Sequence, residues 1–170
     1  MIRAILILLL LILSLFSREI KAQNNTKIPC QEKEYSQFDF WLGNWKVYDT
    51  KENLIGTNNI VKIPNACGMQ ENWDSKTSTS KGTSYNFYNK ADNSWNQVWV
   101  DNSGFSLMLK GNYSDKKMIL KSTLIKGKKS DFYHRVTWSN NSNGTVTQVW
   151  DYVSPQGKIL QEVFRGIYKK

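Results

Sequence analysis

The chain has 170 residues, of which 40% are hydrophobic and 22% are charged, and its formal net charge is +9. This length suits a single domain with a hydrophobic core. The positive charge would be compatible with a partner such as nucleic acid or an anionic surface. The lysines, however, are scattered, and arginine, whose forked side chain reads bases and phosphates, is nearly absent after residue 23, so we expect no nucleic-acid partner.

The first 23 residues predict a cleavable signal peptide. Arg3 supplies a positive start, residues 4–16 form an apolar run, and a polar stretch ending at Gln23 follows. A membrane-spanning helix needs about 20 apolar residues, so an uncleaved anchor is the less favoured alternative and we expect no stable membrane insertion. We therefore predict cleavage after Gln23 and a product exported to the periplasm or the extracellular space.

Residues 24–37 form a polar N-terminal tail that contains Cys30. In an oxidising compartment Cys30 can pair with Cys67, which would close 37 residues and stabilise the fold by about 4 kcal/mol. In the alternative, Cys67 is a small buried residue and Cys30 remains a thiol. The chain has no CxxC motif and no cysteine beside its single histidine, so we expect no metal site.

From residue 38 onward the chain is a series of short apolar or alternating segments, and Asn, Asp, Gly and Ser dominate the connections. Such short connections fit hairpins, and a meander of about ten strands has exposed edges unless it closes. We predict an all-β domain over residues 38–170: one antiparallel up-and-down barrel of about 8 to 10 strands, preceded by a short helical turn in residues 35–42. The predicted strands are 45–50, 54–63, 69–73, 83–88, 95–101, 105–109, 118–125, 132–139, 145–153 and 159–168.

The residues at 38–45, FDFWLGNW, contain a Gly-x-Trp element that resembles the signature of lipocalins and the wider calycin group. Together with GTSYNFY (82–88), WNQVWVD (95–101), RVTW (135–138) and QVW (148–150), they resemble a family of exported bacterial proteins with a lipocalin-like barrel. The resemblance covers nearly all of the chain after the signal and implies a fold and a compartment. It also implies that Gly43 and Trp45 begin the first strand and that Arg165 stacks on Trp45 to close one end of the barrel.

Strand alternation places large aromatic and isolated polar side chains on one face, which suits a ligand cavity, although a solid core would look the same. The leading interpretation is a protein that binds a small, mostly apolar or aromatic molecule inside the barrel. The candidate binding residues are Tyr85, Phe87, Gln97, Trp99, His134, Trp138, Gln148 and Trp150.

Three alternatives stay open. The first is a barrel enzyme of the isomerase or cyclase type that uses His134 with an inward carboxylate, Glu71 or Glu162. The second is haem binding through His134, because small haem barrels resembling nitrobindin use one histidine and open with a Gly-x-Trp-like segment. The third is a partner-binding module with exposed aromatics and no internal void. We assign no catalytic residue, because no Ser-His-Asp or Cys-His set can be assembled. The oligomeric state is not determined by the sequence.

Overall fold

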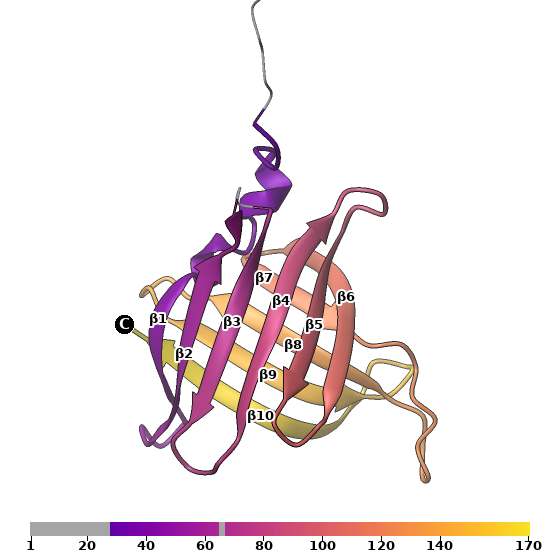
Figure 1. The fold of residues 1–170 in the computed structure, drawn as a ribbon. Helices are drawn as coiled ribbons and strands as arrows, with labels where there is room; N and C mark the ends of the chain where they lie inside the picture. Colours follow the sequence, from indigo (N-terminus) through magenta and orange to yellow (C-terminus); the bar gives the residue numbers. More distant parts are fainter. Residues whose placement is uncertain (1–27, 65–66) are drawn as a thin grey trace, which may run out of the picture.

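The computed structural model describes residues 28–64 and 67–170, and these form a closed barrel (Figure 1). The predicted signal peptide, residues 1–23, lies outside the described residues. Every strand is antiparallel to its neighbours in the sequence, and β1 pairs with β10 to close the ring. The predicted all-β up-and-down barrel is therefore confirmed, with ten strands. The strands are β1 (Gly43–Tyr48), β2 (Leu54–Lys62), β3 (Gly68–Ser75), β4 (Lys81–Asn89), β5 (Ser94–Asp101), β6 (Ser106–Ser114), β7 (Lys117–Lys121), β8 (Tyr133–Asn140), β9 (Val146–Val153) and β10 (Ile159–Lys169).

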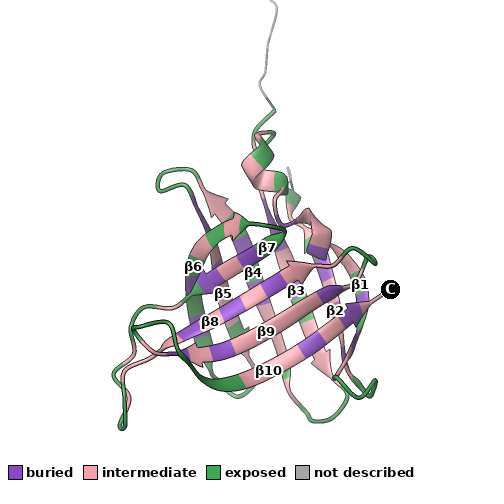
Figure 2. Ribbon diagram, turned by 180° about the vertical axis from the view of Figure 1, so that it is seen from behind, coloured by how far each residue is buried: buried purple, intermediate pink, exposed green. Residues whose placement is uncertain are grey.

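Alternation along the strands sorts side chains between the interior and the outer surface. In β8, His134, Val136 and Trp138 are buried and the residues between them are less so, as the colouring of Figure 2 illustrates. The strand predicted at residues 118–125 is shorter than expected, because β7 ends at Lys121. Beyond Lys121 the backbone N–H of Ser122 still donates to the His134 carbonyl at 2.9 Å, but the Ser122 hydroxyl, at 3.0 Å, accepts the backbone N–H of His134. One backbone acceptor of the ladder is therefore replaced by a side chain.

One end of the barrel is closed by aromatic side chains. Two short 3-10 helices, η1 (Lys33–Ser36) and η2 (Asp39–Trp41), precede β1, and they lie at the top of the barrel in Figure 1. The fully buried Phe38 ring stacks on Trp41 at 5.0 Å and meets the ring of Trp138 at 5.2 Å. The predicted helical turn is confirmed, and its Phe38 and Trp41 belong to the buried core at this closed end.

A disulfide between Cys30 and Cys67 joins the segment before η1 to the connection between β2 and β3. The disulfide therefore links the segment that leads into the helical turns directly to the barrel, at the connection between β2 and β3.

The prediction that Arg165 stacks on Trp45 is wrong. Lys170 supplies the cation instead, since its Nζ lies 4.8 Å from the centre of the Trp45 ring. Arg165 lies on the outer face, where its Nη2 pairs with Glu162 at 2.5 Å, because alternation along β10 turns Tyr168 inward and Arg165 outward. Gly43, at φ +129°, leaves room for Lys170, whose Cε would lie 3.2 Å from an added Cβ.

Candidate functional site

The barrel contains a cavity of about 400 Å³ that opens at the end opposite the helical turns. Its rim includes Ser75 and Asp101, the last residues of β3 and β5, together with residues of the loop that follows β3. Besides these, the deeper wall is formed by residues from seven strands: Ile55, Glu71, Trp73, Gln97, Trp99, Leu107, Val136, Gln148, Trp150, Val163, Phe164 and Tyr168. The cavity contradicts the interpretation as a module without an internal void.

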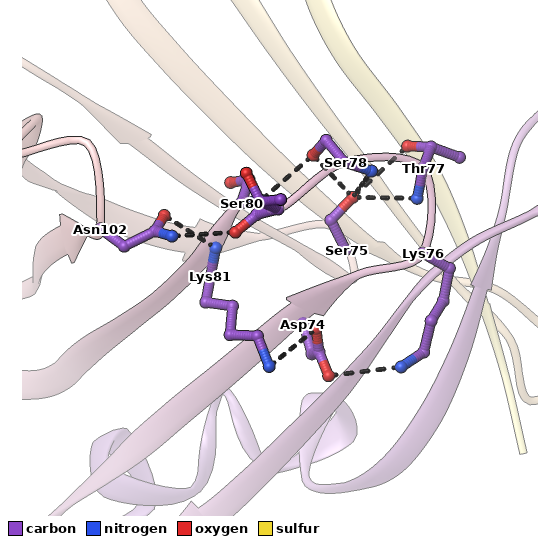
Figure 3. Close-up of polar contacts among 9 residues, drawn as sticks. Asp74, Ser75, Lys76, Thr77, Ser78, Ser80, Lys81 and Asn102 are labelled. Atoms are coloured by element: carbon purple, nitrogen blue, oxygen red, sulfur yellow. Dashed lines mark hydrogen bonds and ion pairs between the residues drawn. The ribbon is translucent and has the colours of Figure 1, made fainter.

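The rim loop between β3 and β4 is held by hydrogen bonds within the loop and to the neighbouring loop after β5 (Figure 3). The Ser75 hydroxyl accepts the backbone N–H of Ser78 at 3.2 Å, and Asn102 from the next loop accepts the backbone N–H of Lys81 at 3.0 Å. Short polar side chains thus give one side of the mouth a defined shape, because each satisfies backbone groups that the turn leaves unpaired.

Near the mouth, aromatic rings form what we call the aromatic layer, defined as Trp73, Trp99, Trp150 and Phe164. Two glycines make room for the tryptophans. A Cβ added at Gly56 would lie 2.2 Å from the Trp73 ring, and one added at Gly82 would lie 2.2 Å from the Trp99 ring. The two rings therefore lie flat against the barrel wall over backbone that carries no side chain, which leaves the lumen open.

One step further in, polar side chains form a second ring, which we call the polar layer: Glu71, Gln97, Gln148 and Tyr168. Strands β3, β5 and β9 run toward the mouth, and in each of them the polar residue stands two positions before a tryptophan of the aromatic layer. Because residues two apart share one face of a strand, the polar layer lies deeper than the aromatic layer. A molecule entering the barrel passes the rings first and reaches the polar groups last.

Glu71 is the centre of a buried hydrogen-bond network. Asn58 Nδ2 donates to Glu71 Oε1 at 2.7 Å, and the Ser84 hydroxyl donates to Glu71 Oε2 at 2.6 Å. The same Asn58 amide donates to the Tyr168 hydroxyl at 3.2 Å. On the other side, Gln97 Nε2 donates to Ser84 Oγ at 3.3 Å. The network fixes the carboxyl group in one orientation facing the cavity.

Burial changes the acid–base behaviour of this network. Desolvation raises the pKa of Glu71 to about 7, although the hydrogen bonds from Ser84 and Asn58 act in the opposite direction. Desolvation, together with the charge of the nearby Glu71, raises the pKa of Tyr168 well above its usual value of 10. At the rim, hydrogen bonding from Ser103 lowers the pKa of Asp101. Near neutral pH, Glu71 is therefore populated both as a neutral acid and as a carboxylate.

Half of the eight candidate binding residues line the cavity, namely Gln97, Trp99, Gln148 and Trp150. Trp138 is fully buried against Phe38 at the closed end instead. The expectation that Tyr85 and Phe87 face the interior is wrong, since they are 51% and 38% exposed. The two chain neighbours Ser84 and Asn86 take the inward positions of β4, because Ser84 pairs across the sheet with Glu71 and Trp99.

His134 is buried in the wall and is not among the residues that line the cavity. Its Nδ1 accepts the indole N–H of Trp150 at 2.9 Å, and the rings of Phe132 and Tyr152 pack around it at 5.5 and 4.9 Å. Desolvation lowers its pKa below 6.5, which favours the neutral ring. His134 therefore orients Trp150, a residue of the aromatic layer.

The two carboxylates considered as partners for His134 lie on opposite faces of the barrel. Glu71 lines the cavity, whereas Glu162 lies outside and pairs with Arg165. The enzyme alternative requires a cavity in which Glu71 or Glu162 approaches His134, but His134 is not among the residues that line the cavity with Glu71.

Sequence reasoning missed several cavity residues, above all Trp73, Tyr168 and the buried supports Asn58, Ser84 and Asn86. A signal for them exists in β2 and β4. In both strands a glycine is followed two positions later by a small or polar residue, Asn58 after Gly56 and Ser84 after Gly82. This pattern indicates an inward face with space above it.

None of the helices among residues 28–64 and 67–170 has the length and apolar character needed to cross a membrane. In the same residues, no group of three or more His, Cys, Asp or Glu side chains is placed to hold a metal ion. The sequence matches no model of a known protein family and none of the curated proteins.

Proposed function

We propose that this protein is an exported binding protein that holds one small, mostly apolar or aromatic molecule inside its barrel. The observation that carries the proposal is the layered cavity of about 400 Å³. Ligand pockets in proteins have volumes of about 300 to 1,000 Å³ and combine an apolar lining with a few placed polar groups. Here the aromatic layer supplies contact area and the polar layer supplies orientation.

The Cys30–Cys67 disulfide supports the exported location, because disulfides persist in oxidising compartments and are rare in the cytosol. The predicted signal peptide at residues 1–23 agrees with it. A secreted carrier also needs a ligand site that excludes solvent, and the closed aromatic end provides a floor for the cavity.

The enzyme and haem alternatives receive less support than binding. Both depend on His134, whose Nδ1 is occupied by Trp150 and whose ring is packed among Phe132 and Tyr152. Glu71 is the remaining acid–base group at the polar layer, and its described partners are neutral hydrogen-bond donors.

Native mass spectrometry of the secreted protein tests the proposal, followed by ligand-observed NMR against a library of small aromatic and aliphatic compounds. We expect one molecule per chain, and we expect Trp99→Ala, which removes a ring of the aromatic layer, to weaken binding. Tyr85→Ala is the matched control, because it removes an aromatic ring from the outer face of the neighbouring strand β4.

The proposal would be overturned if no compound binds the wild-type protein, or if Tyr85→Ala weakens binding as much as Trp99→Ala. Either outcome would place the contact surface somewhere other than the lumen.

A further inference from the structure

The charges of the cavity are unusual for so basic a chain. Although the net charge is +9, the charged residues that line the cavity are Glu71 and Asp101, and none of its described lining residues is Lys, Arg or His. An anionic ligand would therefore lose its water shell without meeting a cation, and would lie beside a carboxyl group. The lumen disfavours fatty acids and other carboxylates.

Glu71 lacks the counter-charge that other carboxylates of this chain possess. The side chain of Asp151, buried in the outer wall, pairs with Arg135 at 2.8 Å, and the exposed Glu162 pairs with Arg165. Glu71 is only 4% exposed, yet no described lysine or arginine forms an ion pair with it. A buried carboxylate that receives only neutral hydrogen bonds is incompletely compensated, because such charges are normally paired.

The surroundings of Glu71 also contain more acceptors than donors. Asn58 uses its amide N–H groups on Glu71 and Tyr168, and its buried Oδ1 accepts no hydrogen bond from any described residue. Gln97 likewise donates its amide N–H to Ser84 and Asn86. Its carbonyl Oε1, in a residue that lines the cavity, receives none within residues 28–64 and 67–170. A ligand that brings N–H donors and a positive charge would satisfy both deficits.

We propose that the ligand carries a protonated amine that forms an ion pair with Glu71 and donates to Gln97 Oε1, while its apolar body lies within the aromatic layer. This inference rests on the proposed binding function and names the chemical class of its ligand. Trp73 stands two residues beyond Glu71 on the same face of β3, so a cation at Glu71 is also close to a tryptophan, the ring that attracts cations most strongly.

The protonation state of Glu71 in the empty barrel agrees with this assignment. Since the pKa of Glu71 is about 7, the empty cavity can hold the group as a neutral acid and avoid an unpaired buried charge. Binding of an ammonium group then converts the acid to the carboxylate, and the proton leaves to solvent. Below pH 7, each binding event therefore releases up to one proton.

The test uses two series of probes that differ only in charge: 2-naphthylmethylamine, 2-naphthalenemethanol and 2-naphthoic acid, and then octylamine, octanol and octanoic acid. Isothermal titration calorimetry at pH 8 compares them on the wild-type protein. In at least one series we expect the amine to bind ten times more tightly than the alcohol, and the acid to bind most weakly.

Two variants locate the effect. Glu71→Gln keeps the size of the side chain and removes its charge, so the amine should lose its advantage over the alcohol while the affinity for the alcohol changes little. Glu162→Gln is the matched control, because it removes the same charge from the outer face, and it should leave all affinities unchanged.

Proton release from the wild-type protein provides a readout that does not depend on a variant folding. Titrations at pH 6 in two buffers with different ionisation enthalpies should show that close to one proton leaves per amine bound and none per alcohol. If alcohols or acids bind as tightly as amines, or if no proton is released, the amine inference is wrong and the binding function stands. If none of the six probes binds, both are contradicted.

Discussion

The two ends of the barrel are built from the same kind of side chain with opposite results. At the closed end, Trp41 and Trp138 are fully buried and pack against Phe38. At the open end, Trp73 and Trp99 lie against the wall and border a cavity. The two ends differ in the residues that face the rings. Residues before β1 fill the closed end, whereas glycines at the open end let the tryptophan rings lie flat against the wall.

Tryptophan content alone therefore says little about whether a barrel encloses a cavity. A barrel interior is filled when side chains from all sides meet at its axis, and it stays open when bulky rings are set against residues without side chains. The position of Gly56 and Gly82 relative to the tryptophans is therefore more informative than the tryptophans themselves.

Removing a tryptophan should destabilise the protein much more at the closed end than at the open end. Trp41→Ala leaves a void in a fully buried cluster and should lower the free energy of unfolding by about 3 to 5 kcal/mol. Trp73→Ala should cost clearly less, because Trp73 is only partly buried at the cavity wall. Urea denaturation of both variants checks this prediction. Equal losses would contradict the distinction between a packed end and an open one.

The next effect concerns the polar layer between the two ends. The pKa of Glu71 is about 7 in the folded protein and near 4.5 in the unfolded chain, so the folded state holds this proton more tightly. The resulting stability is fully present below pH 4.5 and is lost as the pH rises through 7, by about 3 kcal/mol in total. Glu71→Gln should remove this loss, which makes the variant more stable than the wild type at pH 8.

Urea denaturation from pH 4 to pH 8 measures the effect of Glu71→Gln. Glu162→Gln serves as the control, because its carboxylate is exposed and paired with Arg165. A wild-type protein whose stability rises between pH 5 and pH 8 relative to Glu71→Gln would show that Glu71 is compensated in the folded state.

A smaller effect tests the glycines of the open end. Gly82→Ala places a Cβ 2.2 Å from the Trp99 ring, so the ring must move into the lumen. We expect a loss of about 1 to 3 kcal/mol in the free energy of unfolding, typical of overpacking, together with weaker binding of naphthyl probes. Tyr85→Ala on the outer face of the same strand should leave probe binding intact. Unchanged binding by Gly82→Ala would mean that the position of Trp99 does not shape the cavity.

Much of the fold was predictable because the relevant signals are local. Turn-forming residues and period-two alternation mark ten strands, and hairpin connections permit only an up-and-down order. The same alternation correctly places His134, Val136 and Trp138 on one inward face. The helical turn before β1 was also predictable, since its apolar residues follow a polar tail and precede the first strand.

The candidate site was only half predictable because the facing of a strand depends on its partners. Hydrophobicity alone favours Tyr85 and Phe87 as the inward residues of β4, and pairing of Ser84 with Glu71 reverses that choice. The predicted stacking of Arg165 on Trp45 is wrong for a similar reason, because a shift of the strand by one residue moves a side chain from one side of the barrel wall to the other. Register is set by contacts between strands, which one-dimensional patterns do not contain.

The affinity for amines should depend on pH. If an ammonium group pairs with the Glu71 carboxylate, the protein must first lose a proton, so affinity falls as the pH drops below the Glu71 pKa of about 7. Between pH 8 and pH 6 we expect the affinity for 2-naphthylmethylamine to weaken about tenfold, which corresponds to about 1.4 kcal/mol.

Other titrating groups near the cavity do not produce the same profile. Hydrogen bonding lowers the pKa of Asp101 below its usual value near 4, and burial raises that of Tyr168 above 10, so neither changes charge between pH 6 and pH 8. His134, whose pKa is lowered below 6.5, lies outside the lining and pairs with Trp150. Glu71→Gln should therefore bind the amine weakly at both pH values, and calorimetry of the two proteins at pH 6, 7 and 8 measures the difference. A tenfold slope that persists in Glu71→Gln would assign the titration to another group and remove Glu71 from the ligand site.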